Sequence, residues 1–227
     1  MLQLPGATEG PATLVRPARP GVLAIWVAST GQPRPCVLAD LVLRVAERHH
    51  LRASVSGPAP AGWAELNVYP AGVAASPPEP LDVAVAAANS PAGGGPAGAP
   101  AHRLTPGPAG PVDSAGLDPL SLRLAFLGHP YREELTLTRA DLEAADAALR
   151  DLREQVRHWA LSPSRPMCAQ YTGDFLGALD DDLDSPAALR TLSALAADQV
   201  IPDGSKFEAF AYLDRFLGLD LARDVGR

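Results

Sequence analysis

The chain has 227 residues, enough for one large domain or two small ones with a buried core. It contains 20 Gly and 24 Pro, and 47% of its residues are hydrophobic, which excludes a chain that is disordered throughout. No apolar run reaches the roughly 18 residues of a membrane span, so we expect no membrane partner. The first twenty residues are broken by prolines and lack an apolar segment, which predicts no signal peptide and a cytoplasmic location.

Charge is distributed unevenly along the chain. Residues 1–116 contain seven Arg and seven Asp or Glu, whereas residues 117–227 contain twelve basic and nineteen acidic residues and carry the whole net charge of −7. Because nucleic-acid-binding proteins usually have a basic surface, this balance disfavours a nucleic-acid partner. The two cysteines, Cys36 and Cys168, are too few for a disulfide scaffold or a cysteine-rich zinc site, and Lys206 is the only lysine.

The N-terminal part has the pattern of a β-α-β unit. Residues Val22–Ala28 (VLAIWVA) are a short apolar run between turn-like segments, which predicts a buried strand. Apolar residues at helical spacing follow over residues 37–50, and residues 52–56 predict a second strand. Strands joined in this way are parallel, and such a unit begins many nucleotide-binding α/β folds.

Residues 57–112 differ in composition, since 21 of these 56 positions are Gly or Pro. The stretch 90–101 (SPAGGGPAGAPA) is typical of a flexible linker. Two short apolar islands, at residues 63–69 and 81–88, interrupt the Gly- and Pro-rich stretch 57–112. We therefore expect a connector with short ordered islands and no packed core of its own.

The remainder is predicted to be helical. Asp118 is an expected N-cap for a helix at Pro119–Leu127, and Thr138 for a long helix at residues 139–161. Further helices are expected at residues 168–179, 187–197 and 206–216. The apolar stripe of the long helix comprises Leu142, Ala145, Leu149, Leu152 and Val156. Four or five antiparallel helices of this kind predict a bundle.

Three phrases in this half, LGALDDDLDSPAALRT, DPLSLRLAFLGHPYREELTL and FLGLDL, together resemble cysteinyl-tRNA synthetases, a family of class I aminoacyl-tRNA synthetases. Residues 176–191 (LGALDDDLDSPAALRT) are similar to the phrase that opens a helix of the family's C-terminal bundle after an acidic run. Residues 118–137 (DPLSLRLAFLGHPYREELTL) resemble the family's D-P-E-A-L-R helix and the H-Y-R-S-P-L turn after it. Residues 216–221 (FLGLDL) are similar to a frequent ending. The resemblance extends in order and spacing over residues 117–227.

Over residues 21–110 the resemblance is fragmentary. The run VLAIWVA is similar to the family's first strand, which ends in a zinc-binding cysteine, and Ala28 takes that place here. Residues 63–70 (WAELNVYP) resemble the family's L-N-V phrase. The H-I-G-H signature that precedes the next helix is absent, and residues 103–107 (RLTPG) stand where K-M-S-K-S is expected.

These departures affect the chemistry that the resemblance implies, namely ATP-dependent activation of cysteine with the help of zinc. In the family, the signature histidines and a loop lysine stabilise the negative charge that develops on the leaving pyrophosphate. Here Pro106, which has neither a charge nor an N–H donor, stands at the second lysine position. The stretch that holds most of the family's catalytic domain is also missing. We expect a truncated, degenerate member with no catalytic, cofactor-binding or metal-ligating residue, and with neither ATP nor zinc as a cofactor.

The other polar residues have ordinary structural explanations. His49 and His50 end a helix, where an imidazole interacts favourably with the helix dipole. Cys36 and Cys168 lie near helix starts without a base beside them, so structural thiols are favoured over reactive ones. The aspartates of residues 180–184 lack the spacing of a calcium-binding loop and are interpreted as a capping and solvated segment. A group of arginines interleaved with carboxylates predicts exposed ion pairs rather than a phosphate-binding strip: Arg132, Arg139, Arg150, Arg153 and Arg157.

The expected fold class is an α/β remnant, a Rossmann-like β-α-β unit, followed by an all-α helical bundle. The expected domains are the reduced α/β remnant at 1–56, the connector at 57–116 and the bundle at 117–227. The leading hypothesis is a synthetase-like paralogue that has lost aminoacylation and acts as a binding or regulatory module, with a protein as partner and with weak tRNA binding at most. An ATP-dependent cysteine-tRNA ligase and a decaying gene product without a selected role remain alternatives.

Overall fold

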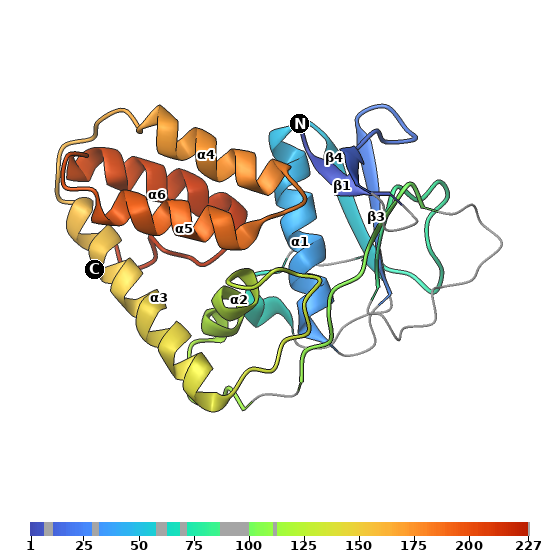
Figure 1. Ribbon diagram of the computed structural model, residues 1–227, viewed down its shortest axis with the longest axis horizontal. Helices are drawn as coiled ribbons and strands as arrows, with labels where there is room; N and C mark the ends of the chain where they lie inside the picture. Colours follow the sequence, from blue (N-terminus) through green and yellow to red (C-terminus); the bar gives the residue numbers. More distant parts are fainter. Residues whose placement is uncertain are drawn as a thin grey trace. The chain divides into compact units, whose positions relative to one another are not determined.

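The computed structural model of the protein describes residues 1–6, 11–28, 32–57, 63–68, 72–86, 100–110 and 113–226. The chain divides into two compact units (Figure 1). Unit 1 comprises Met1–Pro111, Pro130–Thr136 and Asp180–Leu183, and unit 2 comprises Val112–His129, Leu137–Leu179 and Asp184–Arg227. The α/β fold followed by a helical region that the sequence predicts is confirmed.

Unit 1 contains a five-stranded parallel sheet in the order β5-β4-β3-β6-β7. The helix α1 (Pro33–Arg48) connects β3 to β4, so the first parallel pair is the predicted β-α-β unit. Counted from β3, this strand order is 3-2-1-4-5, the order found in Rossmann-like sheets. The strands are β3 (Val22–Ala28), β4 (Arg52–Gly57), β5 (Gly72–Val73), β6 (Val83–Ala86) and β7 (His102–Leu104).

Alternation along the strands gives one face of the sheet an apolar core. Ile25 is in register with Val83, and Val83 with His102, so these three side chains share a face. Ile25 and Val83 are fully buried. The helix α1 packs against β3, β4 and β6, and buries Leu41 and Val42.

The Gly- and Pro-rich stretch 57–116 contributes to this sheet. The strands β5, β6 and β7 all come from it, and β6 and the 3-10 helix η1 (Trp63–Leu66) coincide with its two apolar islands. All four residues of β6 are buried because the strand pairs with β3 on one side and β7 on the other. Residues 87–99, which hold most of the predicted linker, lie outside the described residues.

Two short N-terminal strands lie beside the edge strand β7. The strands β1 (Gln3–Pro5) and β2 (Ala12–Leu14) pair in the antiparallel sense. Gly6 forms a bridge with His102, whose ring Nδ1 lies 3.0 Å from the Pro5 carbonyl oxygen. His102 therefore lies in the edge strand β7 of unit 1, within the stretch that the sequence predicts to be a connector.

Unit 2 is helical. The helices that start at Pro119 and Arg139 begin where the sequence signals predict, whereas the last two helices begin earlier than predicted, at Ser185 and Asp203. The Asp118 side chain accepts a hydrogen bond from the Leu120 amide at the start of α2, and Thr138 forms a capping box with Asp141 at the start of α3. Asp184 caps α5 by accepting from the Ala187 amide. The helices are α2 (Pro119–Leu127), α3 (Arg139–Trp159), α4 (Ala169–Asp180), α5 (Ser185–Ala197) and α6 (Asp203–Leu217).

The core of unit 2 forms where α3 packs on α2 and on α6, and where α5 packs on α2 and α6. Leu142, Leu149 and Val156 of the predicted stripe are fully buried. Ala145 and Leu152 are half-buried, and the buried place beside Val156 is instead occupied by Arg153. Trp159 packs edge-on against Phe210, with ring centroids 4.9 Å apart.

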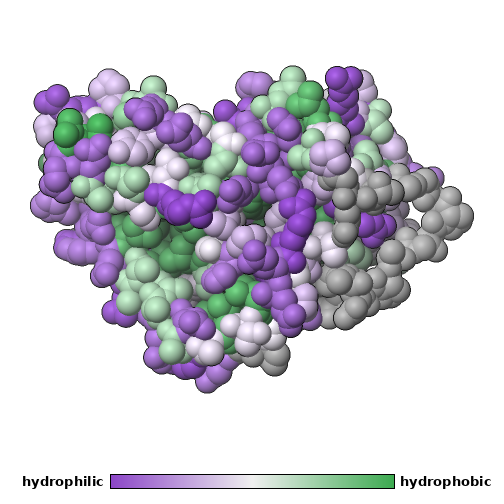
Figure 2. Space-filling model, viewed as in Figure 1, coloured by the Kyte–Doolittle hydropathy of each residue, from purple (hydrophilic) through white to green (hydrophobic). Residues whose placement is uncertain are grey.

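Hydrophilic side chains cover much of the described surface seen in Figure 2. Large apolar side chains that are strongly exposed include Leu161 and Val200, at 83% and 86%. No helix among the described residues is both long and apolar enough to cross a membrane.

Candidate functional site

Open parallel α/β sheets bind ligands at the carboxyl ends of their strands, beside the point where the strand order reverses. In unit 1 this point lies between β3 and β6, which end at Ala28 and Ala86, a pair in register. Residues 29–31 and 87–99, which follow these two strands, lie outside the described residues. The described segments that follow β3 and β7 at this edge are the start of α1 and residues 105–110.

The start of α1 has few backbone donors. Its first residues are Pro33, Arg34 and Pro35, and the two prolines have no N–H. Gln32 at the N-cap makes no side-chain capping bond, and the first turn has no acidic residue. A helix that binds an anion at its N-terminus does so through these N–H groups, and α1 lacks two of them.

Arg34 is the main polar group at this edge. Its side chain is 2% exposed, and its guanidinium donates to the carbonyl oxygens of Gly107, Glu133 and Pro130 at 2.9, 2.6 and 2.9 Å. Burial lowers the pKa of Arg34, and the charge of Glu133 opposes this effect. The Nε atom has no hydrogen-bond partner within the described part of the chain.

We name residues 105–110, which follow β7, the β7 strap. Its Gly107 amide donates to the Tyr131 carbonyl at 2.8 Å, and the Leu135 amide donates to the Pro108 carbonyl at 2.9 Å. A Cβ at position 107 would lie 2.0 Å from the Glu133 carbonyl oxygen, so only Gly fits there. Pro106, which stands at the family's second loop-lysine position, and Gly107 thus belong to a segment held by backbone bonds.

The acidic residues 180–184 form specific contacts, and the prediction of a solvated segment is wrong for two of them. Asp180 binds Arg48 at 2.7 Å and His49 at 2.6 Å, and Asp182 accepts from the Tyr131 hydroxyl at 2.8 Å and pairs with Arg132. Burial alone would raise the pKa of Asp180, but hydrogen bonds from His49, Arg48 and the N-terminal ammonium outweigh it, so the pKa is lowered. These carboxylates are held by cations because they fold back onto unit 1, which spacing alone does not reveal.

The two cysteines lie in different units of the described structure. Cys36 is buried, and burial raises the pKa of its thiol to about 11, as suits a structural cysteine. Cys168 is half-buried and belongs to unit 2. Across the residues that the structure describes, no group of three or more His, Cys, Asp or Glu side chains is arranged to hold a metal ion.

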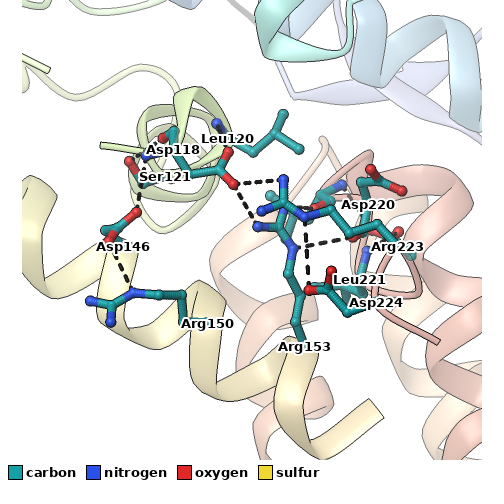
Figure 3. A network of polar contacts seen from close by, with 12 residues as sticks. Asp118, Leu120, Ser121, Asp146, Arg150, Arg153, Asp220, Leu221, Arg223 and Asp224 are labelled. Carbon is teal, nitrogen blue, oxygen red and sulfur yellow. Dashed lines mark hydrogen bonds and ion pairs between the residues drawn. The ribbon is translucent and has the colours of Figure 1, made fainter. Parts of the chain in front are cut away.

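Unit 2 contains a polar network that joins the start of α2, α3 and the segment after α6 (Figure 3). The Asp118 carboxylate faces Arg153 and Arg223, at 2.6 and 2.8 Å. Burial alone would raise the pKa of Asp118, but hydrogen bonds from Arg153 and from the Leu120 amide outweigh it, so the pKa is lowered. Arg153 also donates to the carbonyl oxygens of Leu219 and Asp220. Its predicted exposure is therefore wrong, whereas Arg139, Arg150 and Arg157 form the predicted surface ion pairs.

The same network holds the FLGLDL phrase at the end of α6. Asp214 accepts from the amides of Leu219 and Leu221, both at 2.8 Å, and the Arg123 Nε donates to the Leu217 carbonyl at 2.5 Å. Burial raises the pKa of Asp214, against the effect of its backbone hydrogen bonds. Every one of these contacts is internal to unit 2, so the network explains why the phrase folds as it does and assigns it no chemistry.

The only lysine also has a structural place. Lys206 is 4% exposed, and its ammonium donates to the Ala196 carbonyl at 2.8 Å, near the end of α5. The ammonium lies 5.3 Å from the centroid of the ring of Trp159, a buried residue that packs against Phe210. Tyr171 donates to Asp198 at 3.0 Å, and the side chain of Trp63 lies outside the described residues.

Sequence reasoning missed Arg34, because the apolar periodicity places the helix start at residue 37 rather than at Pro33. The Pro-Arg-Pro order is a signal for the earlier start, since proline favours the first helical turn. Asp82, which accepts from the amides of Ala18 and Ala24 while it is 2% exposed, had no sequence signal at all.

Known proteins are similar to part of the chain. No family model matches it. The L-cysteine:1D-myo-inositol 2-amino-2-deoxy-alpha-D-glucopyranoside ligase of Catenulispora acidiphila is 40% identical over 93 residues, which are 40% of this chain and 20% of the ligase. Ligases of the same name from Thermomonospora curvata and Thermobifida fusca are 33% and 34% identical over 111 and 113 residues, which are 47% and 48% of this chain and 26% of each ligase.

The matched stretch thus spans a fifth to a quarter of the length of these relatives. These relatives are named as ligases of L-cysteine and 1D-myo-inositol 2-amino-2-deoxy-alpha-D-glucopyranoside. The cysteinyl-tRNA synthetases that the sequence phrases resemble are named for tRNA in place of this glycoside. The similarity supports a relationship to the cysteinyl-tRNA synthetase-related ligases over less than half of this chain.

Proposed function

We propose that this chain is a relative of the cysteine ligases that does not activate cysteine and that acts as a non-catalytic binding or regulatory module in the cytoplasm. The proposal takes ATP and zinc to be absent as cofactors. It depends on the residues that stand at the positions where the resemblance implies chemistry.

The observation that carries the proposal is which residues form the β7 strap and how its backbone is bonded. Activation of an amino acid requires positive groups that stabilise the pyrophosphate leaving group. The strap offers Pro106 and Gly107, and its backbone is bonded to residues 131–135 and to Arg34. The chain's one lysine is buried in unit 2 against Ala196 and Trp159. Residues 105–110 therefore contain no lysine, and Lys206 is bonded within unit 2.

The residues near the end of β3 support the absence of zinc. Zinc binds thiolates and imidazoles in a tetrahedral set. Ala28 ends β3 where the resemblance implies a cysteine ligand, and Cys36, the next cysteine along the chain, is buried with a raised thiol pKa. Elemental analysis of protein purified without a metal-affinity tag should give well under one zinc per chain, and a stoichiometric result would contradict this part of the proposal.

An ATP-dependent cysteine ligase is the second candidate, because the relatives reported above are named as ligases of L-cysteine and the resemblance to cysteinyl-tRNA synthetases implies ATP. The two candidates differ in one assay. The purified chain is incubated with ATP, L-cysteine and labelled pyrophosphate, beside a competent cysteinyl-tRNA synthetase as a positive control. Exchange no faster than the blank without enzyme supports the proposal, and exchange above it establishes the enzyme.

A protein partner is favoured over tRNA by the charges of unit 2. The exposed arginines of α3 are each paired with a carboxylate on the same helix: Arg139 with Glu143, Arg150 with Asp146 and Arg157 with Glu154. Binding to phosphate needs arginines or lysines in local excess. A pull-down from native cytosol, with the untagged chain as competitor, tests for a protein partner. A specific partner would also speak against a decaying gene product.

A further inference from the structure

The exposed large apolar side chains that the structure describes in unit 2 all lie in two connections between helices. They are Leu161, Met167 and Val200, with exposed fractions of 83%, 38% and 86%. Leu161 and Met167 belong to the connection from α3 to α4, residues 160–168, and Val200 belongs to the connection from α5 to α6, residues 198–202. Single exposed apolar residues are common, whereas several at one place mark an interaction surface.

The two connections meet at one end of unit 2 (Figure 1). A Cβ at Gly204, in the first turn of α6, would lie 2.0 Å from the Pro163 carbonyl oxygen, so the backbones are in contact there. The His158 ring, near the end of α3, lies 4.0 Å from the Asp203 carboxylate. Figure 2 shows green, apolar side chains at the upper left, over this end of unit 2. We name Leu161, Met167 and Val200 the apolar patch.

Hydrogen bonds hold both connections in place. The Asp198 carboxylate accepts from the Val200 amide at 2.8 Å and from the Tyr171 hydroxyl at 3.0 Å, which fixes the second connection to α4. The Leu161 amide donates to the His158 carbonyl at 3.1 Å. Because the backbone is already ordered, covering these side chains costs little additional conformational entropy.

The surroundings of the apolar patch carry charges of both signs. Arg165, in the first connection, is exposed and makes no ion pair with any residue that the structure describes. The side chain of Asp203 is 41% exposed, and its neighbour is the His158 ring. A surface with one cation and one carboxylate beside an apolar centre is complementary to a copy of itself that is turned about a two-fold axis.

We infer that the apolar patch is a contact between two copies of this chain, in which the apolar side chains cover one another and Arg165 of each copy pairs with Asp203 of the other. Stable interfaces have roughly 20–30 residues a side, and this contact centres on three large apolar side chains, so the dimer should be weak. The net charge of −7 per chain is largely screened at physiological salt, where the Debye length is about 8 Å. The inference goes beyond the proposed function, since the contact needs neither ATP nor cysteine.

The first test is sedimentation velocity of the full chain between about 10 µM and 1 mM, at about 150 mM salt. The sedimentation coefficient should rise with concentration in the parent chain and stay that of a monomer in Leu161→Glu, which places two carboxylates in an apolar contact. The matched control is Val73→Glu, since Val73 is a 77% exposed residue of unit 1, and this variant should associate like the parent. A constant coefficient in the parent, or an equal loss of association in Val73→Glu, would overturn the inference.

The second test exchanges the charges beside the patch. Arg165→Asp and Asp203→Arg should each weaken association at least about tenfold, because like charges then meet twice in every dimer of one variant. An equimolar mixture of the two variants should associate as the parent does, since both contacts again join opposite charges. Circular dichroism verifies that the helices are retained. If Asp203→Arg does not fold, Arg165→Asp mixed with Asp203→Asn should still associate better than Arg165→Asp alone. A mixture that associates no better than the separate variants contradicts the two-fold pairing.

Discussion

Arg153 of α3 and Asp118 at the N-cap of α2 form an ion pair of 2.6 Å in which the arginine side chain is 2% exposed. The carboxylate thereby serves two purposes, since it also caps α2 through the Leu120 amide. The guanidinium in turn binds the carbonyl oxygens of Leu219 and Asp220. One side chain therefore connects the beginning of α2 to the segment after α6.

Replacing this arginine should destabilise the helical unit strongly. Arg153→Ala leaves Asp118 without its buried partner and two carbonyls without a donor, so we expect a loss of about 3–5 kcal/mol in the free energy of unfolding. Urea denaturation followed by circular dichroism measures it. Arg150→Ala is the matched control, since the Arg150 side chain is 69% exposed and pairs with Asp146. The free energy of unfolding of Arg150→Ala should stay within about 0.5 kcal/mol of the parent. Equal losses in the two variants would contradict the stabilising role of buried Arg153.

The pH dependence of stability should report the same carboxylate. The pKa of Asp118 is lowered in the folded state, so its ionised form stabilises the fold above the unfolded value near 3.9, and this contribution is lost as the pH falls through the lowered folded pKa. Asp118→Asn should be less stable than the parent at pH 7, and the gap should narrow towards about pH 3. Denaturation midpoints between these pH values test this, and a constant gap would contradict it.

The apolar stripe of α3 gives a direct test of the core. Leu149 is fully buried, and Leu149→Ala should cost about 2–5 kcal/mol because a cavity remains. Leu161, which follows the same helix, is 83% exposed, and Leu161→Ala should change stability by less than about 0.5 kcal/mol. Thermal and urea unfolding of both variants provide the comparison. A small loss in Leu149→Ala would mean that α3 is packed differently.

The two thiols should differ in reactivity. Burial raises the pKa of Cys36 to about 11, so little thiolate forms at pH 8, whereas Cys168 is half-buried. Iodoacetamide at pH 8 should alkylate Cys168 first, as peptide mass spectrometry can follow. Full denaturation in urea is the control, because both thiols should then react at similar rates. Faster modification of Cys36 in the folded chain would contradict its buried position.

Elements with complete local signals could be predicted from the sequence. The strand Val22–Ala28 and the helix Pro119–Leu127 agree with the prediction to the residue, because an apolar run or a cap followed by proline defines each of them. The strand His102–Leu104 could not be predicted, since it has three residues and its place depends on pairing with β6. The same holds for Arg34 and Arg153, whose partners are carbonyls distant in sequence.

Residues 117–227 should bind tRNA weakly, although the resemblance implies that this half of the chain faces tRNA. Residues 117–227 contain nineteen acidic and twelve basic residues, and the α3 arginines are neutralised by Glu143, Asp146 and Glu154. Attraction to phosphate comes from uncompensated cations, so we expect a Kd weaker than about 10 µM at physiological salt. Filter binding against total tRNA measures it. The matched variant Glu143→Gln with Glu154→Gln releases Arg139 and Arg157 from their partners, and it should bind more tightly and with a steeper dependence on salt. Submicromolar binding by the parent chain would show that local contacts outweigh its net charge.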